Sequence, residues 1–256
     1  MNYHIPYVAE RPVKPRSNGI TMMMDKGLSN REAEEFVNSS GEFTDFVKLG
    51  FGTALITRDL HAKLKVYREG NIRPYFGGTL FEVFYVRGMF EQYREFISEY
   101  KLDLVEVSDG TITMDHDEKL RCIEILKNDV QVLSEVGSKL AGVYIPLESW
   151  VNQMKTELQA GAWKVIAEAR ESGTIGIYNP DGSANRELIG NITDNIDQHD
   201  VIWEAPLKSQ QVYFIKMLGA NVNLGNIAPN EVMAMEALRL GLRGDTIMDF
   251  IPAQLV

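Results

Sequence analysis

The chain has 256 residues, of which 45% are hydrophobic and 24% are charged, so it can bury a sizeable apolar core. The formal net charge is −10 and the chain has no basic run typical of nucleic-acid-binding arms, so we expect no nucleic-acid partner. No window approaches the roughly 18 uncharged apolar residues of a membrane span, and residues 1–16 contain no apolar signal segment. We therefore expect a cytoplasmic protein with no membrane partner.

Eight short apolar segments follow one another along the chain, each separated from the next by a longer stretch with helical apolar spacing. They lie at residues 20–25, 44–48, 72–77, 104–109, 130–135, 165–170, 201–204 and 222–226. A strand, a loop and a helix repeated eight times is typical of a (β/α)8 barrel, which usually takes about 250 residues. We predict an α/β protein with a single (β/α)8 TIM barrel over residues 1–256, including a short amino-terminal arm (1–15) and a carboxy-terminal tail (247–256).

Helix starts are marked by three pairs with capping-box spacing, in which two side chains three residues apart bind each other's backbone amides. The pairs are Ser29 with Glu32, Thr79 with Glu82, and Asp115 with Glu118. Each pair comes shortly after a predicted strand. The pattern therefore predicts helices that begin just beyond strand ends, as the barrel requires.

Charged or amide side chains close most of the eight segments, and strand parity places several of them on one face. If that face points into the barrel, its upper layer contains Lys48, Glu106, Glu135, Glu168, Arg170, Glu204 and Asn223. Uncompensated buried charge is costly, so such groups pair with each other, with a divalent cation or with a charged substrate. An ordinary salt bridge to a helix explains any single member equally well. For the set as a whole, a functional site at the carboxyl ends of the strands is the better explanation.

Histidine and cysteine are absent from the predicted strand ends. The four histidines lie in the arm, in helical stretches and before a strand, and the one cysteine, Cys122, has the helical spacing of a packing residue. This disfavours a zinc site and a Cys-His nucleophile, and one cysteine excludes an internal disulfide. Carboxylates with Mg²⁺, and a lysine as proton carrier, are the chemistry that remains.

Two glycine-containing turns are candidate phosphate sites. Gly77 and Gly78 lead directly into a helix, whose first backbone amides can bind an anion. The end of the eighth strand, with Asn223, Gly225 and Asn226, lies where barrels often bind phosphate. For Gly77 and Gly78 a purely conformational role is the better explanation.

Arg239 and Arg243 lie one helical turn apart and resemble an anion clamp. Their helix runs from the top of the barrel to its bottom, however. We therefore expect them to have capping, packing or subunit-contact roles.

Several ordered segments resemble the phosphosulfolactate synthase family. They include Gly-Gly-Thr-Leu-Phe-Glu at 77–82, Glu-Val-Ser-Asp-Gly at 106–110, Ser-Glu-Val-Gly at 134–137, Glu-Ala-Arg-Glu-Ser-Gly at 168–173 and Trp-Glu-Ala-Pro at 203–206. Segments 14–16, 19–22, 221–227 and 238–246 are similar to the family as well. The resemblance is collinear from residue 14 to residue 246, which makes it far more specific than any one glycine motif.

The resemblance implies an enzyme that adds sulfite to phosphoenolpyruvate with Mg²⁺, giving (2R)-phospho-3-sulfolactate, a precursor of coenzyme M in methanogens and of sulfolactate in some bacteria. It also implies a homo-oligomer, with a trimer as the expected form. The same family includes plant heat-stress-associated proteins. A non-catalytic or differently active barrel therefore remains the alternative, because a fold can persist when its chemistry is lost.

The predicted site combines strand parity with this chemistry. Lys139 is the predicted acid, although related sequences commonly have a second lysine at the position of Ser138. Lys48 is also predicted to be catalytic. We expect Lys48 and Arg170 to hold the phosphate or the carboxylate of the substrate. The predicted metal ligands are Glu106, Glu168 and Glu204, with Glu135 as a fourth member. The predicted substrate-binding residues are Arg170, Gly77, Gly78, Asn223, Gly225 and Asn226.

Overall fold

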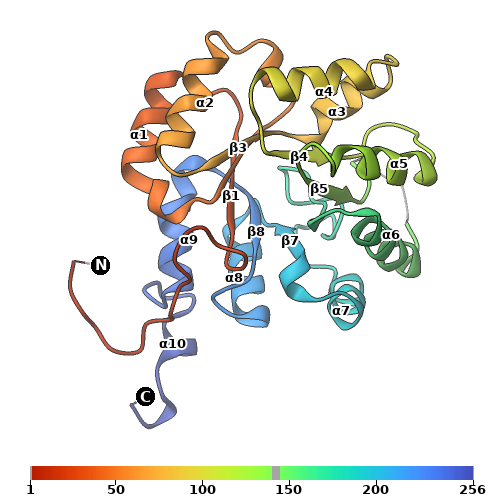
Figure 1. Cartoon of the computed structure of the whole chain (residues 1–256). Coiled ribbons are helices and arrows are strands. Elements are labelled where there is room, and N and C mark those ends of the chain that lie inside the picture. The colour runs from red at the N-terminus through yellow and green to blue at the C-terminus, as the bar shows by residue number, and fades with distance from the viewer. Residues whose placement is uncertain (1, 140–144, 256) are drawn as a thin grey trace.

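The computed structural model describes residues 2–139 and 145–255, and its core is one sheet of eight parallel strands (Figure 1). The strands are β1 (Thr21–Asp25), β2 (Phe46–Leu49), β3 (Arg73–Phe76), β4 (Leu104–Val107), β5 (Gln131–Val136), β6 (Lys164–Ala167), β7 (Val201–Glu204) and β8 (Leu224–Ile227). Each overlaps one of the eight predicted segments, and β1 pairs with β8. The predicted (β/α)8 barrel is confirmed.

Helices surround the strands on the outside (Figure 1). They are α1 (Asn30–Ser40), α2 (Leu60–Glu69), α3 (Gly78–Tyr85), α4 (Phe90–Glu99), α5 (His116–Leu126), α6 (Leu147–Ala160), α7 (Arg186–Asn195), α8 (Lys208–Leu218), α9 (Val232–Arg239) and the short α10 (Ile247–Phe250). Short 3-10 turns are η1 (Gly41–Phe43), η2 (Thr53–Leu55), η3 (Gln198–Asp200), η4 (Pro229–Glu231) and η5 (Ala253–Leu255).

The capping predictions are confirmed in full at one helix, in part at a second and not at the third. Ser29 and Glu32 form a complete capping box at the start of α1. Asp115 caps α5, but its side chain accepts from the amide of Asp117. The prediction for α3 is wrong, because Gly77 is the residue that precedes this helix and Glu82 turns toward the next strand instead.

The barrel has one seam where side chains replace the backbone ladder. Hydrogen bonds join the strands in the order β3-β2-β1-β8-β7-β6-β5-β4, so β3 and β4, which lie side by side, are the two edges. At the amino ends, Arg73 pairs with Asp103 at 3.1 Å and donates to Gln131 at 2.7 Å. At the carboxyl ends, the hydroxyl of Tyr75 donates to Oε2 of Glu106 at 3.0 Å. Polar side chains therefore close the barrel between β3 and β4.

Apolar side chains fill the interior of the barrel below its carboxyl ends. This inner cluster consists of Ile20, Met22, Phe46, Tyr75, Leu104, Leu133, Ile166 and Ile202. A larger cluster fills the space between strands and helices. Gly225 makes room for the inner cluster, because a Cβ there would lie 2.5 Å from Cε of Met22. Any polar site must therefore lie above this apolar layer.

The segment before β1 contains no helix or strand from residue 2 to residue 20, and its basic side chains bind the amino-terminal end of the barrel. Nε of Arg11 lies 2.8 Å from Oε1 of Glu236 in α9, and Arg11 also donates to the carbonyl of Gly19. Lys14 donates to the carbonyls of Gly41 and Thr44. The predicted arm is thus anchored to the bottom of the barrel.

Arg239 is fully buried at the same end of the barrel. Its guanidinium donates to the carbonyls of Val222 at 2.7 Å and Ile20 at 3.1 Å. Arg243 donates to the carbonyl of Ala234. The expectation of packing and capping roles for the two arginines is confirmed.

Candidate active site

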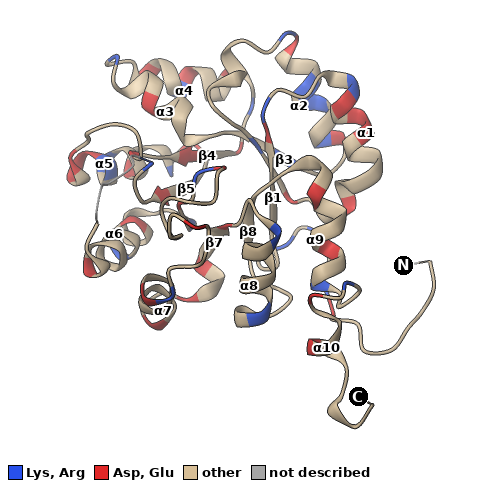
Figure 2. Ribbon diagram, turned by 180° about the vertical axis from the view of Figure 1, so that it is seen from behind, with Lys and Arg blue, Asp and Glu red and all other residues tan. Residues whose placement is uncertain are grey.

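A cavity of about 280 Å³ opens at the carboxyl ends of the strands. Its lining includes Lys48, Glu135, Lys139, Glu168, Arg170, Glu204 and Asn226. Figure 2 shows acidic and basic segments close together around the ends of β4, β5 and β7. The structure therefore gathers charged ends of separate strands at one mouth, as strand parity predicts.

Lys48, from β2, crosslinks three other strands through its buried ammonium group. Its Nζ lies 2.8 Å from Oε1 of Glu106 on β4, 3.2 Å from Oε2 of Glu135 on β5 and 3.2 Å from Oε1 of Glu204 on β7. Burial alone would lower the pKa of Lys48, but the three carboxylates outweigh burial and raise that pKa well above its usual value. Lys48 is therefore a fixed positive charge at the floor of the cavity.

Lys139 lies in the loop after β5 and shares one carboxylate, that of Glu135, with Lys48. Its Nζ forms an ion pair with Glu135 and lies 3.9 Å from Oε2 of Glu168 and 3.3 Å from Oγ of Ser108. Burial opposes the charge, but Glu135 and Glu168 raise the pKa of Lys139 above its usual value. Its side chain is 15% exposed, so this ammonium can be reached from the cavity.

Glu135, Glu168 and Glu204, which we term the three-glutamate group, converge on the cavity. Each is buried and offers a carboxylate oxygen that lies within 4.8 Å of the other two. Glu204 also accepts from the amide of Ala169 at 2.8 Å. Among the described residues, the oxygens of Glu168 accept no hydrogen bond from an N–H or hydroxyl group of a non-acidic residue, and its carboxyl group shares a hydrogen bond with that of Glu135. A fully buried carboxyl group whose hydrogen-bond partner is another carboxyl group keeps acceptor capacity that a cation or a ligand could use.

The three carboxyl groups differ strongly in proton affinity. Burial and the charges of Glu135 and Glu204 raise the pKa of Glu168 well above its usual value. Burial also raises the pKa of Glu204 to about 7, although Lys48 opposes this shift. Burial would raise the pKa of Glu135 too, but Lys139 and Lys48 outweigh it and lower that pKa well below its usual value. Such divergent values in one cleft are typical of functional sites.

The three-glutamate group fits a divalent cation that prefers oxygen ligands, such as Mg²⁺. Together with Glu106, four carboxyl groups lie around the ammonium groups of Lys48 and Lys139, and Arg170 at the cavity is the one further cation among the described lining residues. A divalent cation would balance this excess of acidic groups and would occupy the available oxygens of Glu168.

Glu106, a predicted metal ligand, lies outside the three-glutamate group. Its Oε1 accepts from Lys48 and, at 2.6 Å, from the amide of Gly78, while its Oε2 accepts from Tyr75. Both oxygens are therefore already used by the protein. Glu106 lies on the edge strand β4, and its bonds to Tyr75 and Gly78 reach across the seam to β3 and the start of α3.

Arg170 and Asn226 line the cavity, as expected for substrate-binding residues. Arg170 is exposed, and among the residues that the structure describes its guanidinium has no hydrogen-bond or ion-pair partner. Nδ2 of Asn226 donates to the carbonyl of Ala169 at 3.0 Å, whereas its Oδ1 is buried and unpaired. Both side chains therefore have polar groups available to a ligand.

Packing and hydrogen bonds within the chain account for the three predicted glycines, Gly77, Gly78 and Gly225. Gly77 lines the cavity, but its amide donates to the carbonyl of Leu49 at 3.0 Å. A Cβ on Gly78 would lie 2.3 Å from Cβ of Ser108, and the amide of Gly78 is taken by Glu106. Gly225 packs against the inner apolar cluster instead of the cavity.

The predicted place of Asn223 in the upper layer is wrong. Its Oδ1 accepts from the amide of Ile20, and its Nδ2 donates to the carbonyls of His199 and Val201, all at the amino ends of strands. The cause is that β8 begins only at Leu224 and that its register with β1 is irregular. Asn223 therefore lies below the strand whose end it was expected to mark.

Sequence reasoning missed a polar chain beside the three-glutamate group. Oγ of Ser108 lies 2.7 Å from Oε1 of Glu135 and 2.8 Å from Oε1 of Glu82. Glu82 also accepts from the amide and the hydroxyl of Thr111. Glu82 and Ser108 both belong to segments that carry the family resemblance. The capping-box spacing of Glu82 predicts a helix cap instead of these contacts with Ser108 and Thr111.

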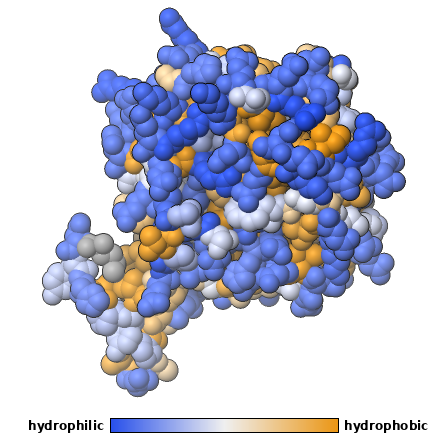
Figure 3. All heavy atoms as spheres, viewed as in Figure 1, coloured by the Kyte–Doolittle hydropathy of each residue, from blue (hydrophilic) through white to orange (hydrophobic). Residues whose placement is uncertain are grey.

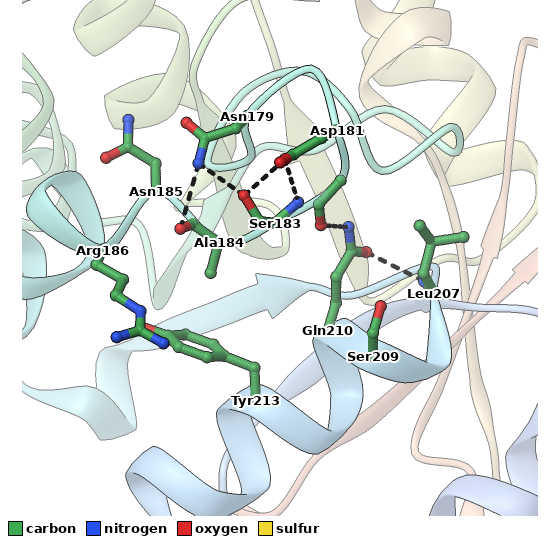
Figure 4. Close-up of a pocket in the computed structure, with 11 residues that line it drawn as sticks. Asn179, Asp181, Ser183, Ala184, Asn185, Arg186, Leu207, Ser209, Gln210 and Tyr213 are labelled. Atoms are coloured by element: carbon green, nitrogen blue, oxygen red, sulfur yellow. Dashed lines mark hydrogen bonds between the residues drawn. The ribbon is translucent and has the colours of Figure 1, made fainter.

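A larger hollow of about 710 Å³ lies elsewhere, between the loop after β6 and the start of α8 (Figure 4). Its polar side chains bind each other, as Ser183 does with Asp181 at 2.6 Å and with Asn179 at 2.9 Å. Gln210 donates to the carbonyl of Gly173 at 2.8 Å. The hollow lacks the buried charges of the smaller cavity, so we place the active site in the cavity of about 280 Å³.

The fold and the cavity define a (β/α)8-barrel enzyme whose site is built from glutamate and lysine. Comparison with known families shows that residues 9–245 match (2R)-phospho-3-sulfolactate synthase (ComA). The chain belongs to this enzyme family. It is 41% identical over 243 residues to the phosphosulfolactate synthase of Methanothermobacter thermautotrophicus, covering 93% of this chain and 94% of that protein. It is 38% identical to that of Bacillus subtilis, covering 92% and 95% of the two chains.

Solved structures with little sequence similarity share the fold. A 3-hexulose-6-phosphate synthase superposes with a TM-score of 0.55 at 12% identity, covering 86% of this chain and 99% of that one. The 3-keto-L-gulonate-6-phosphate decarboxylase of Vibrio cholerae gives a TM-score of 0.52 at 13% identity, covering 91% and 98%. At such identities the likeness shows the barrel alone. None of the helices in the described ranges is long and apolar enough to span a bilayer.

Proposed function

We propose that the protein adds sulfite to phosphoenolpyruvate with the help of Mg²⁺ and forms (2R)-phospho-3-sulfolactate. The observation that carries this proposal is the ammonium of Lys139, which is held at the cavity beside the three-glutamate group. Membership in the family and the names of its relatives support the product. The two substrates follow from the reaction that the family resemblance implies.

The reaction needs a carbon–sulfur bond and one proton. The lone pair of sulfite sulfur attacks the methylene carbon of phosphoenolpyruvate, and the electrons of the double bond move toward the carboxylate as an enolate. A proton then reaches the carbon that bears the phosphate, which completes the phosphosulfolactate. A divalent cation bound by Glu135, Glu168 and Glu204 would supply positive charge for the substrate carboxylate.

Lys139 is the proposed proton donor. The ion pair with Glu135 and the proximity of Glu168 keep its amine protonated in the ligand-free protein, and a cation bound by these carboxylates would lower its pKa toward that of an effective proton donor. Its backbone amide donates to the carbonyl of Gly110 at 2.9 Å, so the main chain is fixed as well. Delivery from this one side of the cavity would account for a single stereoisomer of the product.

The remaining cations have separate tasks. Arg170 is the proposed anchor for the phosphate or the carboxylate of the substrate, because its planar guanidinium can make two parallel contacts and is unpaired among the described residues. Lys48 already binds three carboxylates. We assign it the task of holding Glu135 and Glu204 in place beneath the substrate.

Phosphorus-31 NMR tests the proposed function directly. Pure protein incubated with phosphoenolpyruvate, sulfite and Mg²⁺ should convert the substrate resonance into that of a phosphorylated secondary alcohol, and omission of sulfite should prevent the change. An unchanged spectrum in the complete mixture would refute the synthase activity and favour a protective or differently active barrel. In a thermal-shift assay, phosphoenolpyruvate with Mg²⁺ should raise the melting temperature of an active synthase.

We also propose that the protein is a homo-oligomer, with a trimer as the form that the family resemblance implies. Apolar side chains of both chain ends are exposed, including Tyr3 at 80% in the arm and Leu255 at 59% in the tail. Figure 3 shows apolar side chains on the projecting part that these ends form. Light scattering should give three times the mass of the 28.9 kDa chain. A deletion of residues 2–7 should weaken the assembly, and a monomeric full-length protein would refute this proposal.

A further inference from the structure

Another buried lysine, Lys119 of α5, lies directly behind Glu135 on the helix side of β5. Its side chain is 1% exposed. Its Nζ donates to the backbone carbonyl of Glu135 at 2.6 Å and to Oδ1 of Asp109 at 2.9 Å, and it lies 2.9 Å from Oε1 of Glu157 in α6. Nothing in the function proposed above uses this ammonium group.

Lys119 occupies the point where β4 leaves the sheet. The ladder between β4 and β5 ends with the pair Val107 and Ser134. The carbonyls of Val132 and Val136 accept hydrogen bonds on the side of β6. Successive residues of a parallel strand direct their carbonyls to opposite sides, so the carbonyl of Glu135 points toward β4. Because β4 has ended there, the ammonium of Lys119 supplies the donor that the next strand residue would have provided.

We propose that Lys119 is a positioning residue that fixes the main chain of Glu135 and, through Asp109, the loop that holds Lys139. The inference rests on the proposed function, because it assigns to Lys119 the alignment of the metal-binding and proton-donating groups.

The link from Asp109 to Lys139 is short. The carbonyl of Gly110, the next residue, accepts from the backbone amide of Lys139 at 2.9 Å. The packing is tight as well, since a Cβ on Gly110 would lie 3.1 Å from Cγ of Lys139. One ammonium group thus fixes both the strand end that carries Glu135 and the turn against which Lys139 rests.

A purely stabilising role explains this arrangement less well. Buried ion pairs such as Lys119 with Glu157 commonly add little net stability over apolar residues of similar size. The pair would therefore be replaceable if stability were its only task. The bond from Lys119 to the carbonyl of Glu135, however, is lost in any such replacement.

The test uses Lys119→Met, the double variant Lys119→Met/Glu157→Gln and the control Lys63→Met. The double variant removes the unpaired buried charge that the single variant leaves on Glu157. Lys63 matches Lys119 closely, because its side chain is also 1% exposed and it pairs with a strand-end carboxylate, Asp25, at 2.6 Å. Circular dichroism selects the variants that fold.

Folded Lys119 variants should bind Mn²⁺, used as a spectroscopic substitute for Mg²⁺, about 10- to 100-fold more weakly in electron paramagnetic resonance titrations without substrate. We expect kcat to fall by a similar factor and KM for phosphoenolpyruvate to stay within about twofold. Lys63→Met should leave the three values near those of the wild type. Normal Mn²⁺ affinity and kcat in the folded double variant would overturn the proposal.

Hydrogen exchange separates this inference from the proposed function. Peptides covering residues 131–139 should exchange faster in the Lys119 variants than in Lys63→Met, because the support of Glu135 and Lys139 is lost. If the wild type neither binds Mn²⁺ nor forms product, the proposed function fails. Unchanged exchange in the Lys119 variants would then overturn the positioning role independently.

Discussion

Nζ of Lys139 lies 3.9 Å from Oε2 of Glu168, across a cavity whose two sides come from different strands. Lys139 belongs to the loop after β5, and Glu168 directly follows β6. Among the described residues, the carboxyl group of Glu168 faces those of Glu135 and Glu204, and the ammonium of Lys139 is the positive charge that opposes the resulting rise of its pKa. The proposed acid and a proposed metal ligand therefore influence each other's charge, and replacing each residue in turn separates their effects on turnover and on metal binding.

Replacing Lys139 should remove the chemical step and leave metal binding intact. For Lys139→Ala we expect kcat to fall by about 10²- to 10⁴-fold, the usual contribution of a general acid. Mn²⁺ affinity should stay the same or increase, because a positive charge beside Glu135 and Glu168 disappears. Steady-state kinetics and paramagnetic titration measure the two effects, with the exposed Lys65→Ala as control. Normal turnover in Lys139→Ala would eliminate it as the acid.

Glu168→Gln should weaken metal binding and stabilise the metal-free protein. It removes a buried carboxyl group that faces Glu135 and Glu204, so the metal-free protein should become more stable by about 1 kcal/mol. Mn²⁺ affinity should drop by about 10- to 100-fold, since a ligand oxygen is exchanged for an amide. Urea denaturation and metal titration check these signs. Undiminished metal affinity would exclude Glu168 as a ligand.

Glu106→Gln should instead destabilise the fold. The substitution weakens the contacts with Lys48 and Tyr75, which join β4 to β2 and β3, and the free energy of unfolding should fall by about 3 kcal/mol. The metal affinity of the folded fraction should change less than in Glu168→Gln. Loss of metal binding in a Glu106→Gln variant of normal stability would show that Glu106 is a metal ligand, as the sequence predicts.

Arg170→Met should affect substrate binding more than turnover. We expect KM for phosphoenolpyruvate to rise about 10- to 100-fold with kcat nearly unchanged, since the guanidinium binds a part of the substrate that does not react. Arg186→Met is a matched control, because Arg186 is also exposed but lies at the larger hollow of Figure 4. A larger rise of KM in Arg186→Met would move the substrate site to that hollow.

The lowered pKa of Lys14 should make the stability of the protein depend on pH. Burial lowers the pKa of Lys14 to about 8, with help from Arg16 and against the pull of Asp45. The unfolded chain, with a pKa of 10.5, binds more protons than the native one between about pH 8 and 10.5, so this lysine makes the protein more stable as pH rises through that window. Urea denaturation of wild type and Lys14→Met at pH 7, 9 and 10.5 measures the difference. A constant difference would contradict the shift.

Strand positions could be predicted from the sequence because each strand is a short apolar run followed by a helix. Strand parity then correctly predicts that Lys48, Glu135 and Glu204 lie together, since β2, β5 and β7 are regular at their ends. The same argument misplaced Asn223, because the start of β8 and its irregular register with β1 leave no mark in the apolar pattern.

Two other features could not be predicted from the sequence for different reasons. Glu82 has the spacing of a capping residue, and only the position of Ser108 in space shows why it turns away from its own helix. Lys119 looks like any helical lysine. Its key partner is a backbone carbonyl, that of Glu135, and no residue pattern encodes such a bond.

The pairing of β1 with β8, and of Arg11 with Glu236, determines when the barrel can be completed during synthesis. Thr21 of β1 pairs with Leu224 of β8, so the first strand leaves the ribosome about 200 residues before its partner. At a translation rate of roughly 5 to 20 residues per second, one edge of β1 remains unpaired for about 10 to 40 s. A nascent chain of this protein therefore presents an unpaired apolar edge throughout most of its translation, and chaperones or neighbouring nascent chains can reach it only then.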